Sequence, residues 1–228
     1  MILRKILMLD DGNISESIEG IERKLRREGI QIHIQVLNPQ DHKFKTEVSS
    51  GNFEIDFDKI KKEITENHKS IKYDVVACDF NFSSDTLNGY MLIQWLINIA
   101  NTNQFPFRKA KFVCYSSEEN KFKDHIIHND ELIKLIKLNI HAFYQRKNLV
   151  DDISALVKKI NNNFSMSEHL KMRLNEMPDL KFQKIYPNFK NKTLYEISEE
   201  INKESHHGLS FQKYFVDLTY AHIIELNK

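Results

Sequence analysis

The feature that most constrains the fold is a fivefold alternation of short apolar segments with amphipathic segments along the first two thirds of the chain. The apolar segments are typical of strands, and they span residues 2–11, 30–38, 73–80, 109–117 and 140–146. The segments with helical spacing span residues 14–29, 57–68, 88–102, 129–139 and 149–164. Strands that alternate with helices pair in parallel through right-handed crossovers, with helices on both faces. The sequence therefore predicts an α/β fold with a doubly wound, five-stranded parallel sheet.

Two stretches fall outside this alternation. Residues 39–52 are polar and contain proline and glycine, so we expect a loop or an inserted excursion there. Residues 163–228 show no convincing strand, but they contain two segments of helical periodicity, 193–204 and 209–227. We therefore expect two domains, an α/β domain over residues 1–162 and a small all-α domain over the remainder.

Charge and hydropathy exclude several classes of protein. The chain has 33 Lys+Arg and 32 Asp+Glu, so it lacks the global basic field that is typical of nucleic-acid binding. No apolar run approaches the roughly 20 residues that span a bilayer, and the N-terminus lacks the features of a signal peptide. Cys78 and Cys114 lie inside apolar runs, which favours two buried thiols in a reduced, cytoplasmic protein without a membrane partner. A disulfide between neighbouring strands is the alternative.

The carboxyl ends of the predicted strands carry the residues that could perform chemistry. Asp10 and Asp11 follow the first strand, and Asp79 ends the third. Ser116 ends the fourth strand, and Lys147 follows the fifth. Because ligands of an open parallel sheet bind at this edge, we expect these side chains to meet. Clustered carboxylates repel one another unless a cation neutralises them, and their hard oxygen ligands suit Mg²⁺. A carboxylate beside Mg²⁺ can attack phosphorus, and a hydroxyl and an amine can hold the new phosphoryl oxygens.

The order and spacing of these residues resemble the receiver domain of two-component response regulators, over roughly residues 1–160. The matching segments are ILMLDDG for the acidic pair, YDVVACDF for the phosphoacceptor strand, KAKFVCYSS for the Ser/Thr switch strand and AFYQRKN for the lysine strand. The resemblance implies a flavodoxin-like sheet of order 2-1-3-4-5. It also implies a phosphoprotein of a two-component system or phosphorelay, which accepts a phosphoryl group on Asp79 from a histidine kinase or phosphotransfer protein. Such a protein is regulatory and not an enzyme in the ordinary sense.

The resemblance assigns a role to each candidate residue. Asp11 would contact Mg²⁺ directly together with Asp79, and Asp10 would do so mainly through water. Asn81 would contribute its backbone carbonyl to the metal. Ser116 would move toward the phosphoryl group, and Tyr144 would rotate inward to fill the vacated space. The added charge would thereby bias a two-state element at the last strands and helices.

The chain also departs from the family pattern. Residues 38–56 and 81–88 form longer connections than those of the family, and their roles are not indicated by the sequence. Asn148 stands where the family has a proline, so the loop beside the lysine is expected to differ in shape. Ser117 replaces a small apolar residue. None of these changes removes a reacting group, so we expect them to affect phosphorylation kinetics and partner choice more than the fold.

Each candidate residue has a structural interpretation as well. The three aspartates could cap helices or end solvated strands, and Ser116 or Ser117 could cap the helix after the fourth strand. Tyr144 could be a core aromatic residue, and Lys147 could be a surface lysine. The functional interpretation depends on the ordered set, because no single one of these residues would indicate it.

The C-terminal segment 163–228 has some features of a helix–turn–helix, since a glycine-containing turn separates its two predicted helices. Its basic and acidic residues are equal in number, nine each, and its last helix contains the aromatic residues Phe211, Tyr214, Phe215 and Tyr220. Such a helix packs a core or buries a partner more readily than it binds DNA. We expect an interaction module that can form a homodimer. A DNA-binding transcription regulator and a phosphorylation-independent, receiver-like scaffold are the alternatives.

Overall fold

The computed structural model describes residues 3–84, 87–103, 105–118, 120, 123–124, 127, 132–163, 165–183 and 186–227. The chain divides into two compact units, Met1–Asn162 and Asn163–Lys228. We describe each unit by itself.

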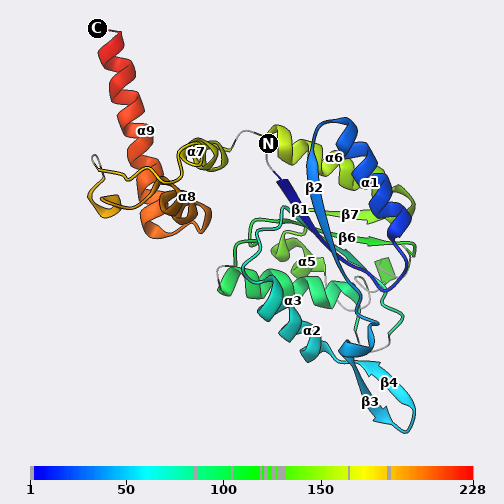
Figure 1. Cartoon of the computed structure of the whole chain (residues 1–228). Helices are drawn as coiled ribbons and strands as arrows, with labels where there is room; N and C mark the ends of the chain where they lie inside the picture. The colour runs from blue at the N-terminus through cyan, green and yellow to red at the C-terminus, as the bar shows by residue number, and fades with distance from the viewer. Residues whose placement is uncertain are drawn as a thin grey trace. The chain divides into compact units, whose positions relative to one another are not determined.

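The first unit is built on a five-stranded parallel sheet (Figure 1). Its strands are β1 (Leu3–Leu9), β2 (Gln31–Leu37), β5 (Val75–Asp79), β6 (Lys111–Ser116) and β7 (Ala142–Gln145). They pair in the order β2-β1-β5-β6-β7. Numbered along the chain, the five strands of this sheet have the order 2-1-3-4-5, which is the flavodoxin-like order. The predicted fold of this unit is therefore confirmed.

Helices cover both faces of the sheet (Figure 1). One face packs against α1 (Ser15–Arg27) and α6 (Leu149–Asn162). The other face packs against α2 (Phe57–Glu63), α3 (Gly89–Thr102) and α5 (Leu132–Leu138). A π-helical turn, Ile64–His68, extends α2. The prediction began the helix that contains α5 at residue 129, but residues 128–131 lie outside the described residues.

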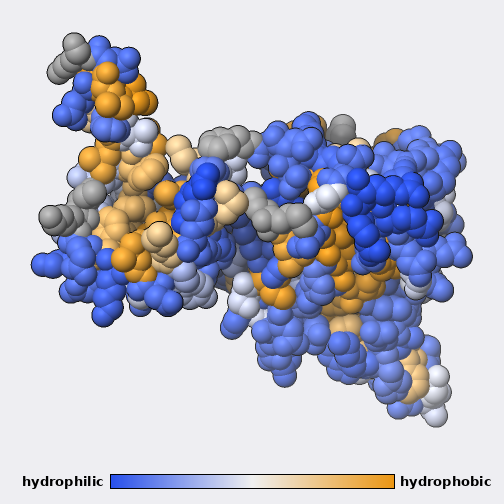
Figure 2. Space-filling view, turned by 45° about the horizontal axis from the view of Figure 1, so that its top comes forward, coloured by the Kyte–Doolittle hydropathy of each residue, from blue (hydrophilic) through white to orange (hydrophobic). Residues whose placement is uncertain are grey.

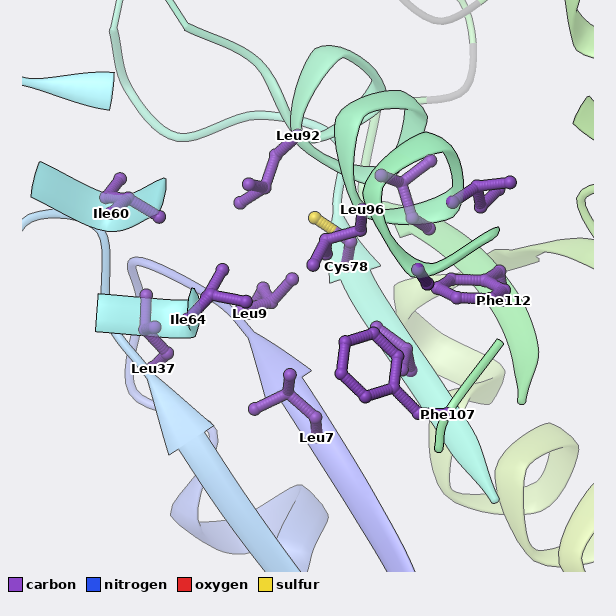
Figure 3. Close-up of a cluster of buried hydrophobic side chains, with 14 of the residues drawn as sticks. Leu7, Leu9, Leu37, Ile60, Ile64, Cys78, Leu92, Leu96, Phe107 and Phe112 are labelled. Carbon is purple, nitrogen blue, oxygen red and sulfur yellow. The ribbon is translucent and has the colours of Figure 1, made fainter. Parts of the chain in front are cut away.

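Both faces of the central strands are buried, which explains their nearly continuous apolar sequence. Within β1, Ile6 and Met8 belong to the core beneath α1 and α6, whereas Leu7 and Leu9 belong to the core beneath α2 and α3. Figure 3 shows the second of these cores, in which side chains from the sheet meet side chains from the helices. Its labelled residues are Leu7, Leu9, Leu37, Ile60, Ile64, Cys78, Leu92, Leu96, Phe107 and Phe112.

The two cysteines lie opposite each other on β5 and β6, and both are buried free thiols. Burial raises the pKa of Cys78 and of Cys114, so both side chains remain protonated at neutral pH. The burial of both cysteines, which the sequence predicted, is confirmed.

An antiparallel hairpin occupies part of the segment that was predicted as a loop. Its strands are β3 (Lys45–Ser49) and β4 (Asn52–Ile55), with Gly51 at a φ of 79° in the turn. The sequence predicted a loop or an inserted excursion here, and the hairpin is the second of these; its strands were not predicted because they are mostly exposed and therefore lack an apolar period. The hairpin is anchored at its base, where Phe44 and Ile55 are buried.

The second unit is all-α in its described regular structure, as predicted, apart from a single bridge between Lys181 and Thr193. Its helices are α7 (Met166–Leu174), α8 (Leu194–Asn202) and α9 (His206–Leu226). Its core consists of Leu170, Phe189, Ile197, Ile201 and Phe211. Helix α7 was not predicted, since Leu170 is its one buried residue and the apolar period is correspondingly weak.

Helix α9 leaves the core of the second unit after its first turns. Gly208 and Phe211 are its buried residues, and the residues beyond Phe211 are exposed or partly exposed. Figure 2 shows hydrophobic side chains gathered on the surface of this unit. Among the described helices, none is both long enough and apolar enough to cross a bilayer.

Candidate functional site

Three carboxylates meet at the carboxyl edge of the sheet. Asp10 and Asp11 follow the end of β1, and Asp79 is the last residue of β5, the strand next to it. One carboxylate oxygen of each residue lies within 4.8 Å of the others. Asp10 is fully buried, Asp79 is 4% exposed and Asp11 is partly exposed. Parallel strands end at the same edge, so the fold itself brings these side chains together.

A guanidinium group bridges two of the carboxylates. Arg146 Nη1 donates to Asp79 Oδ2 at 2.5 Å, and Arg146 Nη2 donates to Asp10 Oδ1 at 3.0 Å. Arg146 directly follows β7 in a short 3-10 turn, Arg146–Asn148, and its side chain is 28% exposed. The planar, forked arrangement of the guanidinium donors suits such paired contacts to oxygen anions.

Lys147, which the sequence suggested as the cation of the site, is exposed beside Arg146. In the described part of the chain, the ion pair to Asp79 comes from Arg146 and not from Lys147. Lys147 instead lines an open cavity of about 550 Å³ next to the carboxylates. The cavity is lined by Ser116, Ser117, Glu118, Asn120, Gln145, Arg146 and Lys147.

Asp10 is held by two further donors. The hydroxyl of Tyr115 donates to Asp10 Oδ2 at 2.6 Å, and the backbone N–H of Gly12 donates to Asp10 Oδ1 at 2.7 Å. Burial and the charge of Asp10 raise the pKa of Tyr115, so the phenol remains a donor. With Arg146, these contacts give Asp10 three hydrogen bonds, which offset the cost of burying its charge.

Among the described residues, Asp79 accepts fewer hydrogen bonds than Asp10. Besides Arg146, its carboxylate receives a long contact of 3.5 Å from the backbone N–H of Asn81 to Oδ1. Burial, and then the negative charge of Asp10, raise the pKa of Asp79 to about 7, although Arg146 acts in the opposite direction. A perturbed carboxyl group of this kind at a sheet edge is characteristic of functional sites.

The loops around the site are tied together by Glu118. The side-chain amide of Asn81 donates to Glu118 Oε2 at 3.2 Å, which links the loop after β5 to the loop after β6. The backbone N–H of Glu118 donates to Ser116 Oγ at 2.9 Å. Ser116 is buried, and its hydroxyl accepts this bond within the turn that follows β6.

Tyr144 lies on β7, opposite Tyr115 on β6. It is partly buried and packs against the core beneath α1 and α6. Burial raises the pKa of its hydroxyl. Tyr144 is therefore a packed aromatic residue in this structure, next to the strand that carries Ser116.

A glycine fixes the position of the end of β5. A Cβ atom on Gly89, the first residue of α3, would lie 1.7 Å from the carbonyl oxygen of Asp79 and 2.9 Å from Cys78 Sγ. The start of α3 is thus in direct contact with the backbone of Asp79. The side chain of Asn88 caps α3 by accepting from the N–H of Met91 at 2.9 Å.

Sequence reasoning missed two of the residues that contact the carboxylates. Arg146 ends the predicted strand 140–146, and a cation at the end of a strand of this sheet is a usable signal. The family resemblance instead assigned the cation of the site to the next residue, Lys147. Tyr115 lies within an apolar run, and nothing in its sequence context indicates that its hydroxyl reaches Asp10.

The donor set fits a small divalent cation. Mg²⁺ prefers hard oxygen ligands and needs few protein carboxylates, and here three carboxylates converge at one edge. Asp10 already accepts three hydrogen bonds, which is consistent with a role through water. Among the described residues, Asp79 Oδ1 accepts one long hydrogen bond, from the backbone N–H of Asn81.

No protein-family model matches the chain, and no curated protein matches it in sequence. Among solved structures, the chain is similar to the Mn²⁺-bound form of response regulator Rcp1, with 11% identity and a TM-score of 0.43 over 71% of this chain and 97% of that one. It is also similar to response regulator RPA3017 in red light signaling of R. palustris, with 13% identity and a TM-score of 0.40 over 70% and 96%. A response regulator protein from Burkholderia multivorans has 12% identity and a TM-score of 0.38 over 72% and 99%. These three structures are response regulators, and the fold of this chain is established by its own strand order.

Proposed function

We propose that the chain is a two-component response regulator whose Asp79 accepts a phosphoryl group from a histidine kinase or phosphotransfer protein. The observation that carries this proposal is the meeting of buried Asp79 with Asp10, Asp11 and a cation at the carboxyl edge of a 2-1-3-4-5 sheet. A structural helix cap would require one such carboxylate, not a cluster of three of which two share a cation. The raised pKa of Asp79 fits the same interpretation.

In the proposed reaction, one carboxylate oxygen of Asp79 attacks the phosphorus atom of a phosphohistidine. The bond between phosphorus and the imidazole nitrogen of the donor breaks, and its electron pair stays on that nitrogen. The product is an acyl phosphate on Asp79, with no change of oxidation state. Mg²⁺ would be held by Asp10, Asp11, Asp79 and the backbone carbonyl of Asn81, and when bound it supplies positive charge to the phosphoryl oxygens.

The residues of this chain would stabilise the product. The guanidinium of Arg146 already contacts Asp79 and can transfer its hydrogen bonds to phosphoryl oxygens, which are strong acceptors. Ser116 and Lys147 line the cavity beside Arg146, so both are near enough to contribute after a rearrangement. Ser116 and Tyr144 would couple the modification to the last strands, as the resemblance implies.

The output is proposed to pass through the helical unit of residues 163–228. Helix α9 exposes large apolar side chains at Leu209, Tyr214, Phe215, Val216, Leu218, Tyr220, Ile223, Ile224 and Leu226. A helix that is apolar on several sides is usually covered by a partner, and we propose a second copy of this chain. DNA binding is not favoured, because this unit has no excess of basic residues. Two free buried thiols favour a reducing, cytoplasmic compartment.

Mass spectrometry of the intact protein after incubation with acetyl phosphate and Mg²⁺ tests the proposal. Wild type is expected to gain one phosphoryl group, which peptide mapping places on Asp79. Asp79→Asn is expected to gain none. Asp58→Asn is the matched control, since Asp58 is an exposed aspartate on α2 and should leave the reaction unchanged. An unmodified wild type, in parallel with a receiver domain that does react, would overturn the proposal.

A further inference from the structure

We propose that Arg146 is an internal counter-cation, which occupies the acidic site in the metal-free state and competes with a divalent cation for Asp10 and Asp79. This inference rests on the proposed function, because it concerns how the phosphoacceptor site takes up its metal. The chain would thus have its own regulator of metal loading, placed one residue before the lysine that the sequence suggested.

The hydrogen-bond pattern is the first argument. Arg146 uses Asp79 Oδ2 and Asp10 Oδ1, two of the four carboxylate oxygens that Asp10 and Asp79 can offer to a cation. Asp10 has its other oxygen on Tyr115 and a further contact from Gly12. A metal ion that binds either of the two oxygens held by Arg146 must therefore replace a donor of that guanidinium.

Burial gives this competition its strength. Asp10 is fully buried and Asp79 nearly so, and charges in such surroundings are poorly screened by salt. The guanidinium relieves the repulsion between the two carboxylates and so stabilises the metal-free site. It also repels an incoming cation at short range. Both effects make the net free energy of metal binding less favourable.

A cavity beside Arg146 can accommodate its side chain when the guanidinium leaves the two carboxylates. The Arg146 side chain is 28% exposed and borders the cavity of about 550 Å³ that Ser116, Glu118 and Lys147 help to line. Glu118 is one of the lining residues, and its carboxylate, which accepts from the Asn81 amide, is an anion to which a displaced guanidinium can donate as well. In its present position the guanidinium lies against the loop after β1, since a Cβ on Gly12 would be 3.1 Å from Arg146 Nη2. That loop carries Asp11, so the guanidinium and the metal would share a confined space.

Binding of Mn²⁺, measured by electron paramagnetic resonance or calorimetry on the full chain without any phosphodonor, tests the inference. Arg146→Gln is expected to bind Mn²⁺ more tightly than wild type, by a factor on the order of ten, which is about 1.4 kcal/mol. Lys137→Gln is the matched control, because it removes an exposed charge on α5, outside the site. Its affinity is expected to stay within about twofold of wild type, as exposed charges interact weakly. Equal or weaker binding by Arg146→Gln would overturn the inference.

A second variant, Arg146→Lys, and a second measurement test the inference in case Arg146→Gln does not fold. Arg146→Lys retains a charge but lacks the fork, so its affinity for Mn²⁺ is expected to lie between those of wild type and Arg146→Gln. In thermal unfolding, Mn²⁺ should stabilise Arg146→Lys more than wild type, since tighter binding to the folded state gives a larger shift. An equal or smaller shift would count against the inference.

The outcomes separate this inference from the proposed function. If Arg146 variants bind Mn²⁺ more tightly but wild type never accepts a phosphoryl group, the counter-cation stands and the proposed function fails. If Asp79 is phosphorylated and the affinity for Mn²⁺ does not depend on Arg146, the function stands and the counter-cation fails.

Discussion

Arg146 donates to Asp79 across 2.5 Å, and the same guanidinium reaches Asp10 at 3.0 Å. The two carboxylates come from different strands, β1 and β5, and the arginine comes from the end of β7. One side chain therefore joins both sides of the site. A lysine ammonium is a single point charge and does not provide this planar fork, so an arginine here can donate to both carboxylates at once.

The hydroxyl of Tyr115 is predicted to stabilise the buried carboxylate of Asp10. Tyr115→Phe removes a donor at 2.6 Å from a fully buried anion, and the free energy of unfolding should fall by about 2 kcal/mol. Urea denaturation measures this change. Tyr144→Phe is the control on the adjacent strand, where no hydrogen bond of the hydroxyl is found in the described structure, and it should cost less than about 0.5 kcal/mol. Equal costs for the two variants would contradict the role of Tyr115.

Gly89 is predicted to be required for the position of Asp79. A Cβ atom there would overlap the carbonyl oxygen of Asp79 at 1.7 Å, so Gly89→Ala must move α3 or the end of β5. We expect a loss of more than about 3 kcal/mol in the free energy of unfolding. Gly51→Ala is the comparison, because Gly51 has open space around it and should cost only about 1 kcal/mol for its positive φ. A mild effect of Gly89→Ala would show that this contact can relax.

The fold could be predicted from the sequence because burial on two faces leaves a clear signal. The segment of residues 73–80 is apolar throughout its centre, and β5 is correspondingly buried along its whole length. The hairpin of β3 and β4 left no such signal. It is held by its backbone ladder and its turn, and its side chains are mostly exposed. Helix α7 was missed for a similar reason, since it buries only Leu170.

The site could be predicted only in part. The positions of Asp10, Asp11 and Asp79 follow from strand ends, and strand ends follow from the apolar runs. The choice between Arg146 and Lys147 depends on the backbone at the end of β7, which turns at once into a 3-10 turn. A shift of one residue there exchanges the side chain that faces the site. No periodicity in the sequence encodes that shift.

Asp74 is predicted to be structural, although it lies in the same segment as Asp79. It accepts from Arg4 Nη1 at 3.1 Å and from the N–H of Lys5 at 2.9 Å, and Arg4 is 2% exposed. Asp74→Ala leaves the buried cation of Arg4 without this carboxylate. We therefore expect the free energy of unfolding, measured by urea denaturation, to fall by about 3 kcal/mol. Asp58→Ala, at an exposed ion pair with Lys61, should cost less than about 1 kcal/mol. The affinity for Mn²⁺ should be unchanged in folded Asp74→Ala, and a large loss would mean that Asp74 acts on the site.

Helix α9 is predicted to mediate self-association. Ile223 is 51% exposed and Tyr220 is 66% exposed, and charges at these positions would be buried in a helix-to-helix interface. Ile223→Glu and Tyr220→Glu should therefore sediment as monomers at concentrations where wild type forms dimers. Glu225→Gln changes a charge on the same helix and should retain the wild-type mass. A monomeric wild type would leave the apolar face of α9 to another partner and contradict the proposed homodimer.

His68 is predicted to make the stability depend on pH. It is buried at the end of the π-helical turn, and its Nδ1 lies 2.7 Å from the hydroxyl of Tyr73, which in turn contacts Gln35 Oε1. Burial lowers the pKa of His68 below its ordinary value, and the charge of Lys43 acts in the same direction, whereas that of Glu63 opposes it. The unfolded chain therefore takes up this proton more readily than the folded one.

The sign of the effect follows from that difference in proton binding. A histidine whose folded pKa is depressed contributes its full stability above the unfolded pKa of about 6.5, and this contribution is lost as pH falls from there toward the folded pKa. Urea denaturation of wild type and His68→Gln at about pH 7.5 and about pH 5.5 brackets this window. Wild type should lose more stability than His68→Gln on acidification, whereas the exposed control His33→Gln should follow wild type. If His68→Gln and wild type lose the same amount, the buried contact between His68 and Tyr73 does not hold a neutral imidazole.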